Sequence, residues 1–258
     1  MAKNLLKNML KEYKRTPGLI NTKDLIERIE SGYLVDNKNG FKKKKTFSPS
    51  SLVYGHGACP RYWYLAFHGT EFHDEVTPHQ VANMRNGTLS HERIQKAIED
   101  SGIMVSKETK IINADPPIFG YQDVEVELNG AAVPGEIKTC NDRSFELRKE
   151  SGRALPYHIA QLAIYMRIRE KENGVIIYEN KNTHELLVIP VEADDEINAW
   201  VDKLFDWCRD VKKASDEDTL PKKQLRSNSK ICKSCPVREA CDSLAKDGVD
   251  IPMLEQLS

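Results

Sequence analysis

The residues best suited to chemistry lie in the segment 120–138. Two strand-like runs of alternating apolar residues flank Asn129-Gly130, a dipeptide typical of two-residue hairpin turns. Glu136 and Lys138 are two residues apart, so on a strand they point to the same face. The hairpin would bring Asp123 beside Glu136. Two carboxylates and an ammonium group at one end of a sheet suit a divalent cation and a phosphodiester.

Asp123 and Glu136 offer the hard oxygen ligands that Mg²⁺ and Mn²⁺ prefer. His91, within a helix predicted over residues 80–101, would add an imidazole nitrogen, which favours Mn²⁺ somewhat more. Lys138 would orient the attacking water or stabilise charge that develops on the phosphate. Each feature also has an ordinary interpretation. Glu-x-Lys on a strand is commonly an exposed ion pair, and a single histidine is often a hydrogen-bonded core or surface residue.

Four of the six cysteines have the spacing of metal ligands. Cys59 stands far upstream of a C-x2-C-x5-C pattern formed by Cys232, Cys235 and Cys241. Four thiolates suit a [4Fe–4S] cluster or a structural zinc, and the spacing does not choose between them. A metal that joined Cys59 to the tail would clasp the two ends of the domain and stabilise the fold. Cys208 lies on the apolar stripe of a helix predicted over residues 194–213, so we expect it in the core.

The composition bounds the class of protein. The 258 residues suffice for one large domain, or one domain with an appended lobe, and 40% are hydrophobic. With 30% charged residues and a mean hydropathy of −0.56, we expect a soluble chain. Apolar runs are too short to cross a membrane, and the N-terminus lacks the features of a secretory signal. We therefore expect a cytoplasmic location and no membrane partner.

The net charge of −1 says little, because a basic groove and an acidic metal site cancel in the sum. Local runs of basic residues are more informative: residues 42–45, residues 212–213, and Lys222-Lys223 with Arg226. Each run is either a solvated face or a phosphate-binding surface.

Periodicity predicts a mixed β-sheet flanked by helices, an α/β fold. We expect helices within residues 1–35, strands within 103–139, a mobile polar loop over 141–156, and a strand hairpin formed by 175–179 and 185–190. A helix over 157–171 would carry Gln161 and Tyr165 on one face, because they are four residues apart. These two side chains would either reach a ligand together or form the polar edge of a packed helix.

Together these residues resemble the RecB-type nucleases of the PD-(D/E)XK superfamily, in particular their iron–sulfur branch. That branch includes the CRISPR-associated adaptation exonuclease, the AddB nuclease domain and related phage nucleases. The matching motifs run in family order over about three quarters of the chain: Phe-Ser-Pro-Ser-Ser-Leu at 47–52 with Cys59-Pro60-Arg61, Gly87-Thr-Leu-Ser-His91, Gly120-Tyr-Gln-Asp123, Gly135-Glu136-Ile137-Lys138-Thr139, Gln161-x3-Tyr165, and Cys232, Cys235 and Cys241.

The resemblance implies a restriction-endonuclease-like fold with an Fe–S-clasped helical lobe. Residues 1–46 would be an N-terminal helical and basic segment, 47–241 the nuclease domain, and 242–258 a C-terminal tail. It further implies that His91, Asp123, Glu136 and the Ile137 carbonyl bind Mg²⁺ or Mn²⁺, and that four cysteines bind a [4Fe–4S] cluster. Gln161 and Tyr165 would lie at the DNA.

The expected activity is a metal-dependent DNA exonuclease that acts on single strands or ends, in recombination, repair or DNA processing. Two alternatives stay open: a structure-specific endonuclease, and a non-catalytic DNA-binding or assembly module. The chain has no Walker-type glycine loop, so any unwinding would come from a helicase, recombination or CRISPR adaptation partner. The family also allows oligomers.

Overall fold

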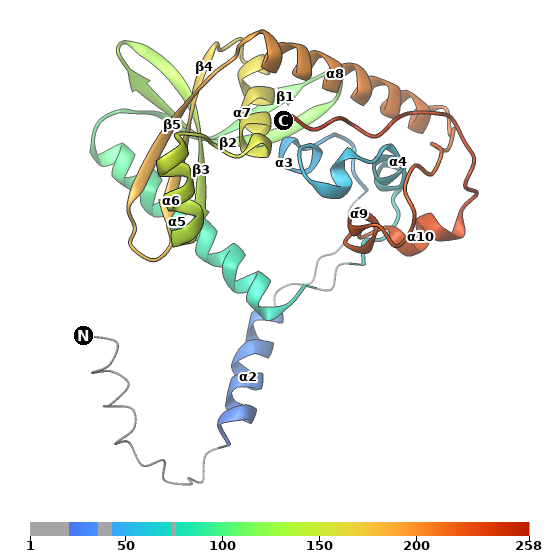
Figure 1. Ribbon diagram of the computed structural model, residues 1–258, viewed down its shortest axis with the longest axis horizontal. Coiled ribbons are helices and arrows are strands. Elements are labelled where there is room, and N and C mark those ends of the chain that lie inside the picture. The colour runs from blue at the N-terminus through green and yellow to red at the C-terminus, as the bar shows by residue number, and fades with distance from the viewer. Residues whose placement is uncertain (1–20, 36–42, 74–75, 258) are drawn as a thin grey trace. The chain divides into compact units, whose positions relative to one another are not determined.

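The computed structural model describes residues 21–35, 43–73 and 76–257, which belong to two compact units (Figure 1). The first comprises residues 1–39 and 76–83, and the second comprises residues 40–75 and 84–258. In the first unit, helix α2 (Thr22–Leu34) begins at Asn21, whose side chain accepts a hydrogen bond from the Asp24 amide. Helix α2 lies within the stretch for which helices were predicted, and residues 1–20 fall outside the described residues.

The second unit contains one mixed sheet and the helices that cover it. In chain order the elements are α3 (Pro49–Leu52), η1 (Gly55–Ala58), α4 (Pro60–His68), α5 (Pro78–Asp100, which starts in the first unit), β1 (Met104–Asn113), β2 (Ile118–Leu128), β3 (Ala131–Cys140), α6 (Asp142–Ser151), α7 (Pro156–Ile168), β4 (Asn173–Asn180), β5 (Leu186–Glu192), α8 (Asp195–Asp216), α9 (Lys230–Lys233) and α10 (Arg238–Ser243).

The five strands lie in the order β1-β2-β3-β4-β5. All neighbouring pairs are antiparallel except β3 and β4, which are parallel. A parallel pair needs a long crossover, and α6 and α7 supply it. The predicted hairpin at Asn129-Gly130 is confirmed: both residues have positive φ, 53° and 80°, as a tight hairpin turn requires.

Each face of the sheet packs against its own helices. Ile94 of α5 packs with Val124, Val126, Ile137 and Ile177 on one face. On the other face, Phe145 of α6 and Leu162 and Met166 of α7 pack with Ile176 and Tyr178. Strand residues therefore alternate between two buried faces, which is why β4 is buried at every position after Asn173.

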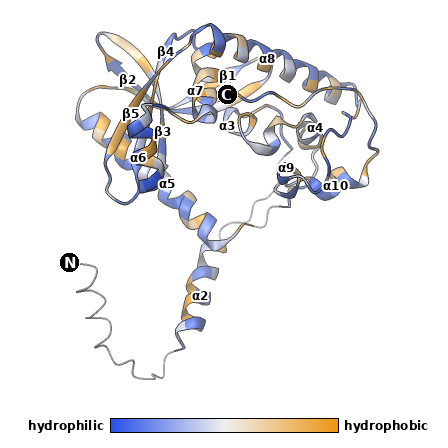
Figure 2. Cartoon of the chain, in the orientation of Figure 1, coloured by the Kyte–Doolittle hydropathy of each residue, from blue (hydrophilic) through white to orange (hydrophobic). Residues whose placement is uncertain are grey.

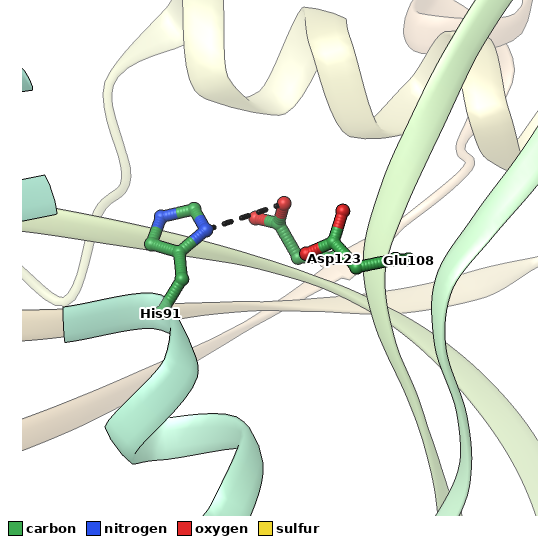
Figure 3. A group of neighbouring side chains, drawn as sticks. All are labelled: His91, Glu108 and Asp123. Atoms are coloured by element: carbon green, nitrogen blue, oxygen red, sulfur yellow. Dashed lines mark ion pairs between the residues drawn. The ribbon is translucent and has the colours of Figure 1, made fainter. Parts of the chain in front are cut away.

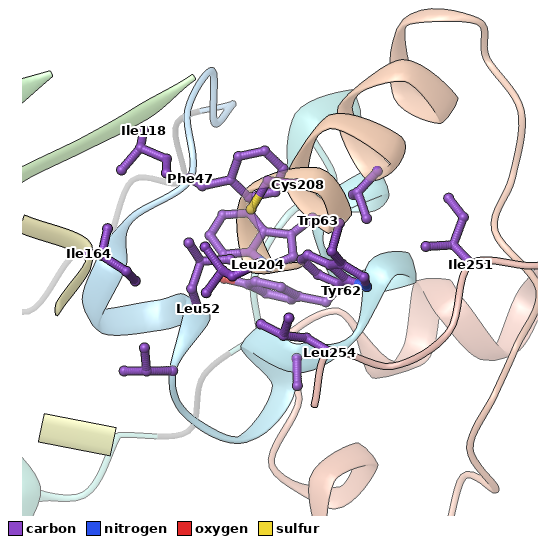
Figure 4. Close-up of a cluster of buried hydrophobic side chains, with 14 of the residues drawn as sticks. Phe47, Leu52, Tyr62, Trp63, Ile118, Ile164, Leu204, Cys208, Ile251 and Leu254 are labelled. Atoms are coloured by element: carbon purple, nitrogen blue, oxygen red, sulfur yellow. The ribbon is translucent and has the colours of Figure 1, made fainter. Parts of the chain in front are cut away.

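A second core lies beyond the sheet, among α3, α4, α7, α8 and the C-terminal segment (Figure 4). Phe47, Trp63 and Cys208 are fully buried there, which confirms the predicted core position of Cys208. The visible face of α8 is mostly hydrophilic, as its apolar stripe requires (Figure 2). The indoles of Trp200 and Trp207 donate to carbonyl oxygens of residues 255 and 252, so the C-terminal segment is held against α8.

The prediction of a mobile loop over residues 141–156 is wrong, because most of it is helix α6. Asn141 caps the helix by accepting from the Ser144 amide, and Gly152 ends it with a φ of 64°. Its charged residues face solvent while Phe145 and Arg148 are buried. The polar composition concealed a helix that buries only one narrow face.

Among the described residues, no helix combines the length and the apolar character that crossing a membrane requires.

Candidate active site

Glu136 and Lys138 project from the same face of β3, as predicted, toward helix α7. The Lys138 ammonium donates to Glu136 Oε2 at 2.8 Å and to the side-chain oxygen of Gln161 at 3.1 Å. The Gln161 amide nitrogen donates to the same Glu136 oxygen at 2.9 Å. Glu136, Lys138 and Gln161 thus form a closed triangle of hydrogen bonds, in which α7 fixes the ends of two side chains on β3.

The triangle uses only one of the two Glu136 oxygens. Glu136 is fully buried, and its Oε1 has no hydrogen-bond partner among the described residues. A buried carboxylate oxygen without a partner is costly, so it normally meets a donor, a water or a cation. This oxygen therefore fits a divalent cation.

Asp123 lies next to this carboxylate because of the hairpin register. Val124 pairs with Gly135 at the end of the β2–β3 ladder that is nearest the site. The next residues, Asp123 and Glu136, therefore lie on adjacent strands just beyond this pair. The Ile137 amide donates to Asp123 Oδ2 at 2.7 Å. The Asp123 carboxylate thus takes the place of a backbone carbonyl as the acceptor for this amide, where the two strands diverge. This bond fixes Oδ2 and leaves Oδ1 directed toward His91.

His91 reaches the same place from α5 (Figure 3). Its Nδ1 lies 3.5 Å from Asp123 Oδ1. His91, Asp123 and Glu108 each offer one ligand atom. These three atoms lie within 4.8 Å of one another, a spacing that suits a metal ion. The structure thus brings together His91, Asp123, Glu136 and Lys138, which the sequence analysis proposed as one site.

Glu108 is the residue that the sequence analysis missed. It lies on β1 between Lys107 and Thr109, which pair with Val124 and Gln122, so the register places it opposite Asp123. Its φ of 48° is unusual for a non-glycine residue in a strand, and such backbone strain concentrates at functional sites. Gln95 of α5 donates to its carboxylate at 2.7 Å. The sequence contains a carboxylate there but does not fix the β1–β2 register.

Tyr165 is buried beside the same strands, with 2% of its surface exposed. A Cβ atom on Gly120 would lie 2.5 Å from the Tyr165 hydroxyl, so this position requires glycine. Gln161 and Tyr165 share one helix face, as predicted. Gln161 bonds to Glu136 and Lys138 on β3, and Tyr165 lies against Gly120 on β2.

The charges of the site are strongly coupled. Burial opposes protonation of His91, but the hydrogen bond and charge of Asp123 outweigh it and raise the His91 pKa. Burial works against ionisation of Asp123, yet His91, Lys138 and the Ile137 amide lower its pKa. Burial raises the pKa of Glu136 despite the Lys138 charge beside it. Glu136 is thus the carboxylate whose ionisation would gain most from a cation.

Helix α5 is anchored around His91 by a buried carboxylate of β4. Glu179 is fully buried, and its Oε1 accepts from Arg93 at 2.6 Å and contacts His184 Nδ1 at 2.9 Å. Burial would raise the Glu179 pKa, but the hydrogen bonds from Arg93, His184 and Ser90 lower it. Ser90 and Arg93 flank His91 on the helix, so Glu179 holds the turn that aims the imidazole.

The four cysteines predicted to bind a metal line one cavity, although they come from distant parts of the chain. Cys59 precedes α4, Cys232 lies in α9, Cys235 follows it, and Cys241 lies in α10. Burial, with a contribution from neighbouring thiols, raises the pKa of Cys59 to about 11 and that of Cys235 to about 12. Ionising these thiols together would require a positive ion among them.

Arg61 holds segments of the C-terminal region around this cavity. It is 1% exposed, and its guanidinium donates to the carbonyl oxygens of Pro221 at 3.0 Å, Cys241 at 3.3 Å and Ala245 at 2.6 Å. The Leu254 amide also donates to the Ala58 carbonyl at 2.8 Å. The C-terminal region is thus attached to the start of α4 by hydrogen bonds of the protein itself.

No family model and no curated protein matches the chain. Among solved structures, an alkaline exonuclease from Laribacter hongkongensis, LHK-Exo, is 15% identical, with 67% of this chain and 90% of that chain covered and a TM-score of 0.51. LHK-Exo in complex with dAMP is 16% identical, with 67% and 89% covered and a TM-score of 0.50. A structure of SSO0001 is 20% identical, with 86% and 98% covered and a TM-score of 0.48.

At these identities the likeness to LHK-Exo concerns the fold. It confirms the predicted fold class, a mixed sheet flanked by helices, and the sheet described for this chain has five strands.

Proposed function

We propose that this protein is a metal-dependent DNA exonuclease that hydrolyses phosphodiester bonds in single strands or at DNA ends. The observation that carries the proposal is the unpartnered oxygen of the fully buried Glu136, next to Asp123 and Lys138. The likeness in fold to LHK-Exo, an alkaline exonuclease that also has a structure in complex with dAMP, supports it.

The proposed metal ligands are His91, Asp123, Glu136 and the Ile137 carbonyl, and Glu108 is added from the structure. Their oxygen-rich donor set suits Mg²⁺ or Mn²⁺. A divalent cation there would act as a Lewis acid that makes water a better nucleophile and stabilises charge on the phosphate.

Lys138 is placed to act on the reacting groups. Its side chain is 20% exposed, and two acceptors in the described part of the chain take two of its three N–H groups. The third can donate to the attacking water or to a phosphate oxygen. The charges of Glu136 and Asp123 outweigh burial and raise the Lys138 pKa, so the ammonium stays protonated.

The test uses purified protein, end-labelled single-stranded DNA and either Mg²⁺ or Mn²⁺. We expect degradation by the wild type, and a loss of about 10²–10³-fold in the Lys138→Met and Glu136→Gln variants. Lys149→Met, at an exposed lysine of α6 that pairs with Glu185, is the matched control, and circular dichroism verifies folding. If the wild type leaves DNA intact with every metal while still binding it, the non-catalytic binding module is the better interpretation.

Circular single-stranded DNA separates exonuclease from endonuclease. An exonuclease leaves the circle intact and degrades the linear form of the same sequence. Cutting of the circle would replace the exonuclease proposal with the structure-specific endonuclease.

We further propose that Cys59, Cys232, Cys235 and Cys241 bind a structural [4Fe–4S] cluster. Four thiols that line one cavity match the donor set of such a cluster, and the family resemblance favours iron over zinc. Anaerobically purified protein should be brown and contain about four irons per chain. A colourless preparation with one zinc per chain would overturn the assignment.

A further inference from the structure

The lysines of residues 43–45 and Lys212, which are far apart in the sequence, line one cavity. The cavity has a volume of about 340 Å³ and is lined by Lys43, Lys44, Lys45, Phe67, His68, Lys212, Ser215 and Asp216. The Lys44 amide donates to the Ala66 carbonyl at 3.1 Å, and the Phe47 amide donates to the Pro117 carbonyl at 2.8 Å. These bonds hold residues 43–45 against the end of α4, where α8 brings Lys212. None of the lining residues belongs to the proposed active site.

The positive charge of this lysine cleft is only partly neutralised. Lys212 pairs with Asp216, and the nearby Asp218 is bound by Tyr64 at 2.8 Å and contacts His68 at 3.2 Å. Among the described residues, no carboxylate forms an ion pair with the ammonium groups of residues 43–45. Four lysines and one aspartate line the cleft, a formal charge of +3, and the nearby Asp218 lowers the excess to two positive charges.

The contacts of Lys44 indicate that the fold holds one of these positive charges in a fixed place. Its ammonium lies 5.0 Å from the ring centre of the fully buried Trp63 and 6.0 Å from that of Tyr62. Burial lowers its pKa. A cation held over aromatic rings and partly removed from water, with exposed lysines on both sides, provides a fixed charge rather than a freely solvated one.

We propose that the lysine cleft binds a backbone phosphate of the nucleic acid strand that the proposed nuclease degrades. Lysine is a point-charge donor that suits phosphate without fixing its orientation, and the rings of Tyr62, Trp63 and Phe67 are buried, so none of these three offers a platform for a base. The contact is therefore independent of sequence. This inference rests on the proposed function and adds a binding site that is separate from the carboxylates.

The test measures the affinity of single-stranded oligo-dT without turnover, in EDTA, across a series of salt concentrations. The Lys43→Gln/Lys45→Gln variant keeps Lys44 on Trp63, so its core is unchanged. The slope of log Kd against log salt should fall by about 0.7, the amount expected for the loss of one phosphate contact on a single strand. The matched control, Lys149→Gln/Lys203→Gln, removes the same charge from exposed positions elsewhere and should leave the slope unchanged.

Each result decides the question. If the wild type binds and cleaves DNA but both double variants have the wild-type slope, the cleft proposal fails and the proposed function stands. An equal loss in both variants shows a non-specific effect of net charge and also overturns the cleft. If the wild type binds no oligonucleotide, both proposals fail. Inorganic phosphate and dTMP serve as competitors; if either displaces the strand at its own micromolar Kd, the ligand is a free phosphate and not a strand.

Discussion

The side-chain amide of Gln161 donates a 2.9 Å hydrogen bond to Glu136 across 25 residues of sequence. The same amide group also accepts from Lys138 through its oxygen. Gln161 thus orients both ends of the Glu-x-Lys pair, and its exchange for an apolar side chain should loosen both. We expect Gln161→Met to lower kcat on single-stranded DNA by about 10²-fold, because small displacements of reacting groups have effects of this size. Gln224→Met, at an exposed glutamine, is the control; equal rates in the two variants would contradict the role.

Glu108 provides a second prediction, because its carboxylate groups with those of His91 and Asp123. Glu108→Gln keeps the acceptor for Gln95 and removes only the charge. We expect at least about tenfold weaker Mn²⁺ binding, measured by calorimetry on the protein without DNA. Glu99→Gln, at an exposed glutamate paired with Lys107, serves as the control. Wild-type affinity in Glu108→Gln would exclude Glu108 from the metal site.

Glu179 should act through His91, since it anchors the turn of α5 that carries the imidazole. In Glu179→Gln we expect the Mn²⁺ concentration for half-maximal activity to rise about tenfold, while kcat at saturating Mn²⁺ stays close to that of the wild type. Electron paramagnetic resonance of free Mn²⁺ gives the affinity without any turnover. In a His91→Ala background the same exchange should have little further effect. A fall in kcat that excess Mn²⁺ does not rescue would instead indicate a general structural role.

The environment of His158 leads to a prediction of how the free energy of unfolding changes with pH. The Tyr178 hydroxyl accepts from the Leu155 amide and also forms a hydrogen bond of 2.7 Å with His158 Nδ1. Burial, aided by the charges of Lys138 and Arg148, lowers the pKa of His158 to about 3. The unfolded chain, with a pKa near 6.5, binds the proton first, so this contribution is complete above about pH 6.5 and is lost as the pH falls toward 3.

Between pH 7 and pH 5, His158→Gln should therefore lose about 1–2 kcal/mol less of its free energy of unfolding than the wild type. Urea denaturation at both pH values measures the difference. Parallel losses in the two proteins would show that His158 accepts a proton in the folded state.

Arg61 should stabilise the cysteine lobe, because its guanidinium holds three carbonyl oxygens of the C-terminal region. Arg61→Met keeps much of the apolar stem and removes the donors. We expect the free energy of unfolding to fall by about 2–4 kcal/mol and the proposed cluster to be lost faster in air, followed by the decay of its visible absorbance. Arg153→Met, at an exposed arginine, should behave as the wild type. Unchanged stability in Arg61→Met would mean that the metal alone clasps the lobe.

The sequence alone determined the parts of this protein that depend on local patterns. Asn129-Gly130 set the hairpin turn, the spacing of Glu136 and Lys138 set their shared face, and the stripe of α8 set the burial of Cys208. These follow from the fixed periods of strand and helix and from the few residues that accept positive φ. The same rules missed α6, because a helix that buries only Phe145 and Arg148 resembles a polar loop.

The tertiary structure decided everything that depends on register and on contacts between distant segments. The register of β1 against β2 placed Glu108 opposite Asp123, and packing of α7 on the sheet turned Gln161 toward Glu136. The lysines of the cleft meet because α4 and α8 pack together in one core, and Glu179 reaches α5 from the far end of β4. A shift of one residue in its strand would turn Glu108 or Glu179 to the opposite face of the sheet. The energy that excludes such shifts comes from burying whole faces, which no short stretch of sequence contains.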